Sequence, residues 1–428
     1  MYKLPIIFFR LLILLTIIGF APSFIESEKN WTHFRGSNLD GIADVESCPI
    51  KWSADSNIVW KSKIHGIGWS SPVVYEDQIW MTTATEDGKE MYAICVDYNS
   101  GKTFFDIKLI TPDSIYRKHN INSYATPTPC IEKDYVYVHF GKYGTGCLST
   151  LDGSVIWKRD DLECLHVQGP GSSPILYNNL LILHLEGTDR QMITALDKKT
   201  GQTIWETERP KEVYDLLEPI GKKAYITPII VTVNERDLMI SNGSAACMAY
   251  DPNTGEEIWR IVRGVDSTIA MPFAEDGTIY FHTGFIVDEE KNKFAELMAV
   301  NPDGYGDIAS SNIKWKIETP ILQLSTPVIK DGLIYTIDTK NNMMCLDAQS
   351  GETIWSHRLR GKYNSSPIYA AGHIYFSSTN GTTTVIEEGS ELKIIAENSL
   401  EGEVWTTPAV INNNILIRTS EYLYRIGK

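Results

Sequence analysis

The sequence predicts an all-β fold, an eight-bladed β-propeller of four-stranded antiparallel blades, and three observations lead to this prediction. A segment with an acid, a polar turn, a Gly and a Trp recurs along the 428 residues, and such recurrence indicates a repeat architecture. A Ser-Pro or Thr-Pro pair precedes almost every copy. Between these landmarks, β-rich runs alternate with Gly and Asn turns, as in a meander of four strands. A four-stranded sheet repeated around an axis is a propeller blade.

The recurring segment is clearest in ALDKKTGQTIW (195–205), AYDPNTGEEIW (249–259) and CLDAQSGETIW (345–355). We expect the acid to accept hydrogen bonds from turn amides, the Gly to supply a positive φ, and the Trp to pack on the next blade. Because the acids occupy equivalent places in successive blades, they are turn residues rather than a catalytic set. The residues assigned to the repeat are Asp97, Gly101, Trp157, Asp197, Gly201, Trp205, Asp251, Gly255, Trp259, Trp315, Asp347, Gly351 and Trp355.

Eight landmark pairs indicate where the innermost strand of each blade begins. The hydroxyl before each Pro is expected to bond to neighbouring backbone, and Met271-Pro272 is the one pair without a hydroxyl. The other pairs are Ser71-Pro72, Thr126-Pro127, Ser173-Pro174, Thr227-Pro228, Thr326-Pro327, Ser366-Pro367 and Thr407-Pro408.

The two ends of the sequence predict how the ring closes. After Pro408 the residues suffice for three strands, and SNIVWKSKI (56–64), with Trp60 in the Trp position of the repeat, precedes the first landmark pair. We therefore expect this N-terminal strand to complete the last blade, which also covers two otherwise unpaired sheet edges.

The first residues predict export. Lys3 and Arg10 precede an apolar run from Leu11 to about Ala21, which is short for a membrane span and typical of a secretory signal. We assign residues 1–23 to a signal peptide, 24–54 to an N-terminal arm and 55–428 to the propeller, with an uncleaved anchor as the alternative. No Cys lies near the expected cleavage site, so a lipid anchor is not expected. The expected location is the periplasm or the cell exterior, with no membrane span after cleavage.

Composition narrows the function. The formal net charge of -15 disfavours nucleic acid, whose phosphates require a basic surface. The seven cysteines are scattered, with no CxxC and no adjacent pair, so we expect few disulfides and neither a paired-Cys zinc site nor a c-type haem. No metal site is predicted.

The repeat, together with the opening WTHFRGSNLDGIA (31–43), resembles the pyrroloquinoline quinone (PQQ) propeller repeat. That superfamily includes PQQ-dependent dehydrogenases and the propeller scaffold of the outer-membrane barrel-assembly machinery. The resemblance implies that His33 and Arg35 anchor the arm. In the dehydrogenases a Trp floor and a vicinal Cys-Cys disulfide enclose PQQ, oxygen ligands hold Ca²⁺ and an Asp acts as base. No motif of this sequence matches the calcium or base positions, so we expect no cofactor, with PQQ and calcium as the less favoured alternative.

The repeat register predicts a candidate binding site. Residues three places before each Pro should ring one mouth of the central channel. Aromatic residues there form a platform for a planar ring, a sugar face or a partner's side chain, or else they wedge between strands as aromatics often do in β structure. The residues at this position are Trp69, Tyr124, Gly171, Tyr225, Ile269, Leu324, Asn364 and Trp405.

Polar residues should collect on the same face, in the loops that lead into the blades. They are suited to an anionic ligand or to acid-base chemistry, although charged loops are often merely solvated. These residues are Arg117, His119 and Asn122 before blade two, His166 and Gln168 before blade three, and Lys222 and Lys223 before blade four.

Three functions follow from these patterns. We favour an exported, non-catalytic propeller that binds a protein, a small ligand or a glycan at its face. The second is a PQQ-dependent oxidoreductase. The third is a carbohydrate-active enzyme that uses the mouth aromatics with His119 or His166. The sequence assigns neither a catalytic residue nor an oligomeric state.

Overall fold

The computed structural model describes residues 1, 30–263, 269–284, 286–288, 292–319 and 324–427. The predicted signal peptide, residues 1–23, falls outside these residues except for Met1. In the described part of the chain, no helix is both long and apolar enough to cross a membrane.

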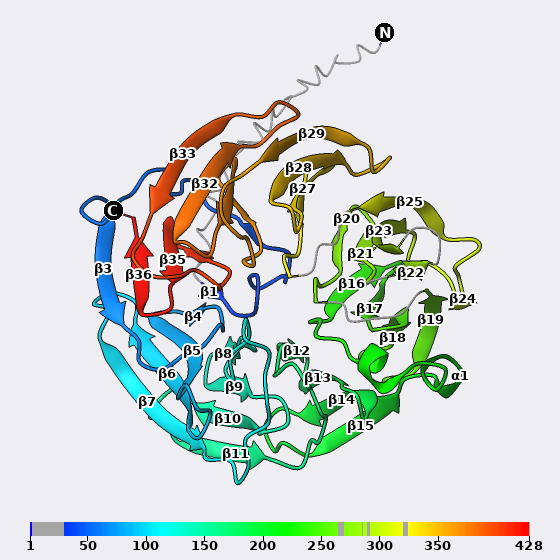
Figure 1. The fold of residues 1–428 in the computed structure, drawn as a ribbon, viewed down its shortest axis with the longest axis horizontal. Coiled ribbons are helices and arrows are strands. Elements are labelled where there is room, and N and C mark those ends of the chain that lie inside the picture. Colours follow the sequence, from blue (N-terminus) through cyan, green and yellow to red (C-terminus); the bar gives the residue numbers. More distant parts are fainter. Residues whose placement is uncertain (2–29, 264–268, 285, 289–291, 320–323, 428) are drawn as a thin grey trace.

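Eight sheets follow one another around a central axis, so the protein is an all-β, eight-bladed propeller (Figure 1). Blades one and two comprise β4 (Val73–Tyr75), β5 (Gln78–Ala84), β6 (Met91–Asp97), β7 (Thr103–Ile110), β8 (Cys130–Glu132), β9 (Tyr135–His139), β10 (Thr145–Ser149) and β11 (Val155–Arg159). Blades three and four comprise β12 (Ile175–Tyr177), β13 (Leu180–Glu186), β14 (Gln191–Asp197), β15 (Thr203–Glu208), β16 (Ile229–Val233), β17 (Arg236–Asn242), β18 (Ala246–Tyr250) and β19 (Glu257–Val262).

The second half of the ring repeats this plan. Blades five and six comprise β20 (Phe273–Glu275), β21 (Thr278–His282), β23 (Asn292–Val300), β25 (Ile313–Thr319), β26 (Val328–Lys330), β27 (Leu333–Ile337), β28 (Asn342–Asp347) and β29 (Thr353–Arg358). Blades seven and eight comprise β30 (Ile368–Ala370), β31 (His373–Ser377), β32 (Thr382–Glu387), β33 (Ile394–Ser399), β34 (Ala409–Ile411), β35 (Asn414–Arg418), β36 (Tyr422–Ile426) and β3 (Ile58–Lys63). The added elements are β1 (Asn30–Trp31), β2 (Ile42–Ala43), β22 (Ile286–Asp288), β24 (Gly306–Asp307), α1 (Lys211–Tyr214) and the 3₁₀ turn η1 (Pro219–Lys222).

Burial follows the position of a strand in its blade. All seven residues of β13 are buried, whereas the outermost strand β15 is largely exposed apart from Trp205. Apolar residues of the inner strands fill the spaces between neighbouring blades, where the large buried clusters lie. Removing this apolar surface from water is the main driving force for stacking the blades.

The repeat Trp residues lie against the turn of the next blade. The indole N–H of Trp157 in blade two donates to the carbonyl of Lys198 in blade three at 2.9 Å, and that of Trp60 donates to Tyr98 at 2.8 Å. Gly201 has a φ of 72°, and a Cβ added to it would lie 2.7 Å from the Trp157 ring. Gly is therefore required here both for the turn and for the close approach of the indole.

The repeat acid closes the same turn. Asp197 Oδ1 accepts hydrogen bonds from the backbone N–H of Lys199 at 3.0 Å and of Thr200 at 2.9 Å. Asp347 accepts an equivalent pair in blade six. These acids hold turns at the periphery of the ring, as the sequence predicts.

A belt of hydroxyl groups joins the innermost strands around the axis. The residue before each blade-starting Pro donates its backbone N–H to the hydroxyl of the equivalent residue in the next blade, except where Met271 offers no acceptor. Each hydroxyl accepts one bond and still has a hydrogen to donate. The N–H···O distances are 2.9 Å for Ser71 to Thr128, 2.9 Å for Thr128 to Ser173, 3.0 Å for Ser173 to Thr227, 3.0 Å for Met271 to Thr326, 2.9 Å for Thr326 to Ser366, 3.2 Å for Ser366 to Thr407 and 3.0 Å for Thr407 to Ser71.

The belt corrects the predicted start of blade two. The sequence ATPTPC contains two Thr-Pro pairs, and the predicted start of blade two is the first of them, Thr126-Pro127. In the structure the second pair, Thr128-Pro129, belongs to the belt. Strand β8 accordingly begins at Cys130, directly after the second Pro. The two pairs look alike locally, and only hydrogen bonds to the neighbouring blades distinguish them.

The N-terminal and C-terminal parts of the propeller meet in blade eight. Strand β3 pairs antiparallel with β36 and is the outermost strand of that sheet. At the axis, the Thr407 N–H donates to Ser71 Oγ at 3.0 Å, which joins blade eight to blade one. Figure 1 shows β3 beside the red C-terminal strands.

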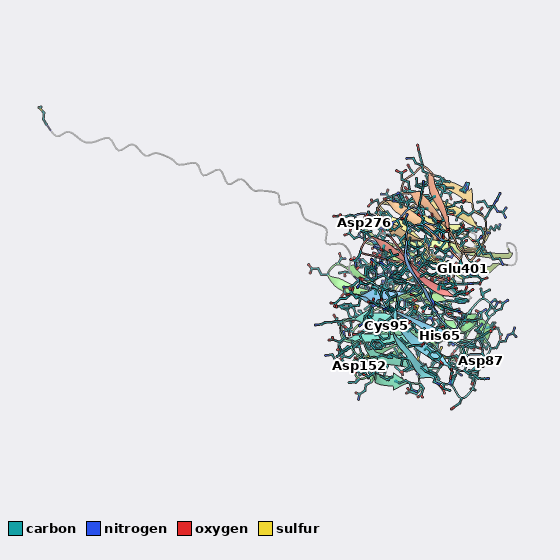
Figure 2. The ribbon with its side chains drawn as sticks, turned by 90° about the vertical axis from the view of Figure 1, so that its left-hand side faces the viewer. His65, Asp87, Cys95, Asp152, Asp276 and Glu401 are labelled. Carbon is teal, nitrogen blue, oxygen red and sulfur yellow. The ribbon has the colours of Figure 1, made fainter. Side chains whose placement is uncertain are left out.

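The disc has two distinct faces. Figure 2 shows it edge-on, with Asp152 and Asp276 on one side and with His65, Asp87 and Glu401 on the other. His65 and Glu401 lie in loops that lead from an outermost strand into the next blade. We call the side that carries these loops the mouth face, because the residues just before each innermost strand belong to it.

The N-terminal arm, residues 30–54, closes the channel at the end away from the mouth face. Its strand β1 pairs with β4 in blade one, and β2 pairs in parallel with β30 in blade seven. Between them, the Thr32 carbonyl accepts the Ile131 N–H of blade two at 3.0 Å. These contacts fall after the blade-starting Pro, whereas the mouth residues precede it. The dark blue segment at the centre of Figure 1 is this arm.

Arg35 fastens the arm to blades six and seven. Its fully buried guanidinium donates to the carbonyl oxygens of Thr326 at 3.0 Å, Pro327 at 2.7 Å, Pro367 at 3.1 Å and Asp40 at 2.8 Å. Burial lowers the pKa of Arg35 to about 10, against the opposing attraction of Asp40.

His33 fastens the arm to blade three. Its Nε2 accepts the Leu176 N–H at 3.1 Å, so the ring proton belongs on Nδ1, which lies 2.8 Å from the Thr32 hydroxyl. Burial lowers the pKa of His33 to about 4. The predicted anchoring role of His33 and Arg35 is thus confirmed.

Candidate functional site

A cavity of about 320 Å³ opens at the mouth end of the channel. All seven hydroxyls of the belt line it, and so does Phe34 of the arm. Because the arm lies beyond the belt, Phe34 forms the floor of the cavity. The rim consists of the residues three places before each blade-starting Pro, which are Trp69, Thr126, Gly171, Tyr225, Ile269, Leu324, Asn364 and Trp405.

Two Trp rings stack on the rim where blades eight and one meet. The centroids of Trp69 and Trp405 are 5.2 Å apart and their planes differ by 16°. The Trp69 N–H donates to the Ile121 carbonyl at 3.1 Å, and the Trp405 N–H donates to Glu403 Oε2 at 2.8 Å. These bonds fix both rings before any ligand arrives, which reduces the entropy cost of binding.

The predicted third aromatic of the platform is not on the rim. Tyr124 is 8% exposed, packs edge-on against Tyr143 at 5.9 Å and donates its hydroxyl to the Tyr116 carbonyl at 3.0 Å. The shifted start of blade two places Thr126 on the rim instead. The predicted platform of three contiguous aromatics is therefore wrong, and two Trp residues form it.

The histidines predicted for the mouth separate in the structure. His119 is exposed and lines the cavity, whereas His166 does not. His166 packs against the Tyr225 ring at 5.5 Å, with its Nε2 3.6 Å from Cys164 Sγ. Burial lowers the pKa of His166 to about 4, so this ring is neutral near pH 7 and supports Tyr225 from outside the cavity.

Two side-chain amides on the cavity wall have unused hydrogen-bonding capacity. The side chains of Gln168 and Asn364 make no hydrogen bond to another described residue, and both line the cavity. Asn122 differs, because its Nδ2 donates to the Gln168 carbonyl at 2.8 Å and to the Pro170 carbonyl at 3.0 Å. Asn122 therefore shapes the loop, whereas Gln168 and Asn364 are available to a ligand.

Lys223 and Tyr225 line the cavity from the loop between β15 and β16. The Lys223 ammonium donates a hydrogen bond to the Ile220 carbonyl at 2.8 Å. The backbone N–H of Ala224, between them, donates to the carbonyl of Glu186 at 3.0 Å. Lys222, predicted beside Lys223, lies 3.7 Å from Asp215 and does not line the cavity.

A buried charged cluster fastens this loop at its other end. Glu186 accepts hydrogen bonds from Arg209 Nε at 3.2 Å and from the Tyr214 hydroxyl at 2.5 Å. Desolvation opposes ionisation, but attraction to Arg209 and contact with His184 lower the pKa of Glu186 to about 2. The cluster is enclosed, so it positions the loop rather than meeting a ligand.

A second hollow, an open groove of about 790 Å³, adjoins the cavity on the mouth face. His119 and Gln168 line both, so the two hollows adjoin each other at these residues. The predicted candidate Arg117 lies in this groove together with Lys118 and Ile220, outside the cavity itself.

The described residues that line the cavity do not provide the ligands that a PQQ site with calcium uses. Calcium takes carboxylate and amide oxygens, and neither an Asp nor a Glu is among the described residues that line the cavity. All seven cysteines are free, and six are buried. Within the part of the chain that the structure describes, no group of three or more His, Cys, Asp or Glu side chains is placed to hold a metal ion. The cavity lining therefore does not fit a PQQ centre with bound calcium.

Several lining residues were missed from the sequence. Phe34 is the Phe of the W-x-x-F-R-G segment, so its motif was visible, but its place as the floor depends on the path of the arm. Thr126 was hidden by the ambiguous Thr-Pro pairs. Six of the seven belt hydroxyls, all except that of Thr128, are predicted as structural, and the structure shows that all seven line the cavity as well.

Comparisons with known proteins place this architecture in a family. The family model described as outer membrane protein assembly factor BamB matches residues 51–212, 189–305 and 293–406. BamB from Yersinia pestis is 21% identical over 278 residues, which cover 55% of this chain and 69% of that protein. BamB from Escherichia coli K12 is 26% identical over 104 residues, which cover 24% of this chain and 26% of that protein.

Two solved structures share the fold. BamB from Moraxella catarrhalis superposes with a TM-score of 0.59 at 13% identity, covering 86% of this chain and 99% of that chain. A quinohemoprotein alcohol dehydrogenase from Comamonas testosteroni superposes with a TM-score of 0.63 at 12% identity, covering 93% and 80%. The three matches of the family model together span most of the propeller, and the chain belongs to the family described as outer membrane protein assembly factor BamB.

Proposed function

We propose that this protein is an exported, non-catalytic propeller that binds a partner segment or ligand in the mouth cavity. The observation that carries the proposal is the stacked Trp69 and Trp405 pair at the opening of a cavity with a floor. Concave sites with apolar walls and a few convergent polar groups are where ligands usually bind.

The wall of the cavity supports binding because it carries hydrogen-bond donors and acceptors that are not used within the protein. Each belt hydroxyl already accepts a backbone N–H and has a hydrogen left to donate. The amides of Gln168 and Asn364 add donors and acceptors at the rim. A group that enters this cavity therefore meets polar partners on the wall and aromatic surface at the rim.

Export and a protein partner are supported by the N-terminal sequence and by the family. Lys3 and Arg10 precede an apolar segment of signal-peptide type. The curated relatives are named outer membrane protein assembly factors. These observations support the proposal that the protein acts outside the cytoplasm, with a protein segment or a glycan as the occupant of the mouth.

The two enzyme alternatives have weaker support. The likeness to an alcohol dehydrogenase concerns the fold, and the described lining lacks the carboxylates that would hold calcium. Glycoside hydrolysis commonly uses two carboxyl groups that face the substrate, and the same lining offers none. Of the predicted histidines, only His119 lines the cavity.

A photo-crosslinking experiment in the native cell tests the proposal. A photoreactive phenylalanine replaces Asn364 on the rim, and in the control it replaces Ile354, which is exposed on the outermost strand β29 of blade six. We expect a defined adduct from position 364 and none from 354. Equal labelling at both positions, or none at 364, would contradict binding at the mouth.

The non-catalytic part of the proposal has its own measurement. The purified protein is incubated with PQQ, Ca²⁺, alcohols or aldoses, and a dye that accepts electrons. No dye reduction above the protein-free rate is expected. Saturable turnover that disappears in Trp69→Ala would establish the oxidoreductase instead.

A further inference from the structure

The mouth cavity and the adjoining groove share two lining residues, and together they define a path over the loops that lead into blades two to four. The groove is bounded by three loops, which connect β7 to β8, β11 to β12 and β15 to β16. His119 and Gln168 lie at the junction of the two hollows. A ligand that fills both is elongated, with one end in the cavity and the rest along the groove.

The charge of this path is opposite to that of the protein. The chain has 54 acidic residues and a formal net charge of -15, and yet neither Asp nor Glu occurs among the described residues that line the cavity or the groove. The lining includes Arg117 and Lys118 in the groove and Lys223 in the cavity. A cleft lined by one sign of charge concentrates ligands of the other sign.

Two lysines at the groove, Lys118 of its lining and Lys142 beside it, lie near aromatic rings. The Lys142 ammonium is 3.3 Å from the centroid of the Tyr116 ring, which lines the groove. The Lys118 ammonium is 5.5 Å from the Tyr124 ring. Cation–π attraction holds each ammonium group near an aromatic ring, so these cations are localised along the path.

The cavity end suits a ring with an apolar face and many oxygen atoms. The Trp69 and Trp405 rings are held by hydrogen bonds through their N–H groups, so their remaining surface at the mouth is apolar. Below them lie the belt hydroxyls, each with a hydrogen to donate. A pyranose ring combines an apolar C–H face with a periphery of hydroxyl and carboxylate oxygens.

We infer that the path binds an acidic oligosaccharide, with one sugar ring against the Trp pair and with carboxylate-bearing rings along Arg117 and Lys118. This inference depends on the proposed binding role of the mouth and specifies its ligand class. An acidic peptide shares the charge, but its residues lack the repeated flat rings that a Trp pair and a belt of hydroxyls accommodate together.

The first test compares two oligosaccharides of equal length. Oligogalacturonate of four to six sugars (roughly the length that a cavity and groove of this size hold) is titrated against the full chain by calorimetry, beside a neutral oligogalactoside. We expect saturable binding of the acidic chain, at least about tenfold tighter than the neutral one, and weakening as salt rises. Equal affinity for both chains, or affinity that salt leaves unchanged, would overturn the inference.

Matched variants locate the site. Arg117→Gln together with Lys118→Gln is expected to weaken oligogalacturonate binding roughly tenfold. The control, Lys102→Gln together with Lys199→Gln, removes the same charge from the exposed β6–β7 and β14–β15 turns on the opposite face and should leave affinity unchanged. Trp405→Ala should weaken binding at least as much as the groove variant. An equal effect from the control pair would show that only net charge matters, which contradicts the inference.

A poly-glutamate peptide separates this inference from the proposed function. If the peptide binds and oligogalacturonate does not, the ligand class is wrong while the mouth remains a binding site. If neither binds but position 364 crosslinks in cells, the inference fails and the proposed function stands. If neither binds and no adduct forms, both fail.

Discussion

The two ends of the central channel are built from the same repeat, but their polar groups differ in burial and in hydrogen bonding. At the arm end, the Arg35 guanidinium is fully buried and donates to four carbonyl oxygens. At the mouth end, Arg117 is exposed, and the amides of Gln168 and Asn364 make no hydrogen bond to described residues. The arm end is therefore a finished interface, whereas the mouth end has capacity for another molecule.

This contrast indicates that the arm end of the channel contributes to the stability of the fold, whereas the mouth end is available for binding. Buried polar groups cost free energy unless they are paired. The arm end accordingly pairs the terminal N–H groups of Arg35 with backbone carbonyls, and Arg35 Nε and Trp31 Nε1 are among the buried arm atoms without a partner among the described residues. Exposed groups are hydrated before binding, so the mouth can keep unused donors at little cost. Substitutions should therefore unfold the protein at one end and change binding at the other.

The largest effect is expected from Arg35→Leu. The variant removes four hydrogen bonds and leaves buried carbonyl oxygens without a donor, which should lower the free energy of unfolding by about 3 kcal/mol or more. Urea unfolding measures the loss, and limited proteolysis should show cleavage within residues 30–54. The matched mouth variant Arg117→Leu should change stability by less than about 0.5 kcal/mol. Similar losses in both variants would contradict the division between the two ends.

The next effect depends on pH and concerns His33. Burial lowers its pKa to about 4 from an ordinary value of 6.5, because desolvation disfavours the charged imidazolium. Protonation of Nε2 would also remove the acceptor of the Leu176 N–H. The neutral ring stabilises the fold fully above pH 6.5, and this stabilisation is lost as the pH falls from 6.5 toward 4. Between pH 7 and pH 5 the loss from this residue is about 2 kcal/mol.

His33→Gln should therefore lose less stability than the parent between pH 7 and pH 5, by about that amount. His119→Gln at the mouth serves as the control and should follow the parent curve. Denaturant unfolding at both pH values provides the measurement. A parent and a His33 variant with the same pH dependence would show that the arm end does not hold this ring neutral.

The fold was predictable from the sequence because each blade carries its own local signals. Gly201 and Asp197 specify a turn by backbone geometry and hydrogen bonding, and Trp157 and Trp205 recur at the spacing that stacks blades. These signals repeat, so one ambiguous copy does not hide the pattern. Blade two was assigned two residues too early because Thr126-Pro127 and Thr128-Pro129 are equivalent until bonds to neighbouring blades distinguish them.

The site was only partly predictable, because it depends on contacts between distant segments. Trp69 and Trp405 followed from the register, and their position on the rim is as predicted. Tyr124 was misplaced by the same two-residue shift. His166 appeared as a candidate by residue type, but its burial against Tyr225 depends on how two loops pack. Phe34 reaches the cavity only because the arm crosses the channel.

A smaller loss of stability is expected at the belt, which lies between the two ends. Thr128→Val keeps the shape of the side chain but removes the acceptor of the Ser71 N–H. The free energy of unfolding should fall by about 1 to 2 kcal/mol. Met271→Leu, at the belt position without a hydroxyl, is the control and should cost less than about 1 kcal/mol. Chemical unfolding of both variants decides, and equal costs would mean that the belt bonds add nothing to packing.

The smallest change in stability is expected from Gln168→Ala and Asn364→Ala. Neither amide bonds to a described residue, and both are only half-buried on the cavity wall, so each variant should unfold within about 0.5 kcal/mol of the parent. A melting curve measures this, and crosslinking from a photoreactive phenylalanine at Ile121, an exposed residue of the cavity lining, measures the effect on binding with each amide replaced in turn. We expect weaker adduct formation with unchanged melting, because these amides satisfy a bound molecule and not the fold. If either variant instead melts well below the parent, the amide is a structural group, and the mouth resembles the arm end more closely than its contacts indicate.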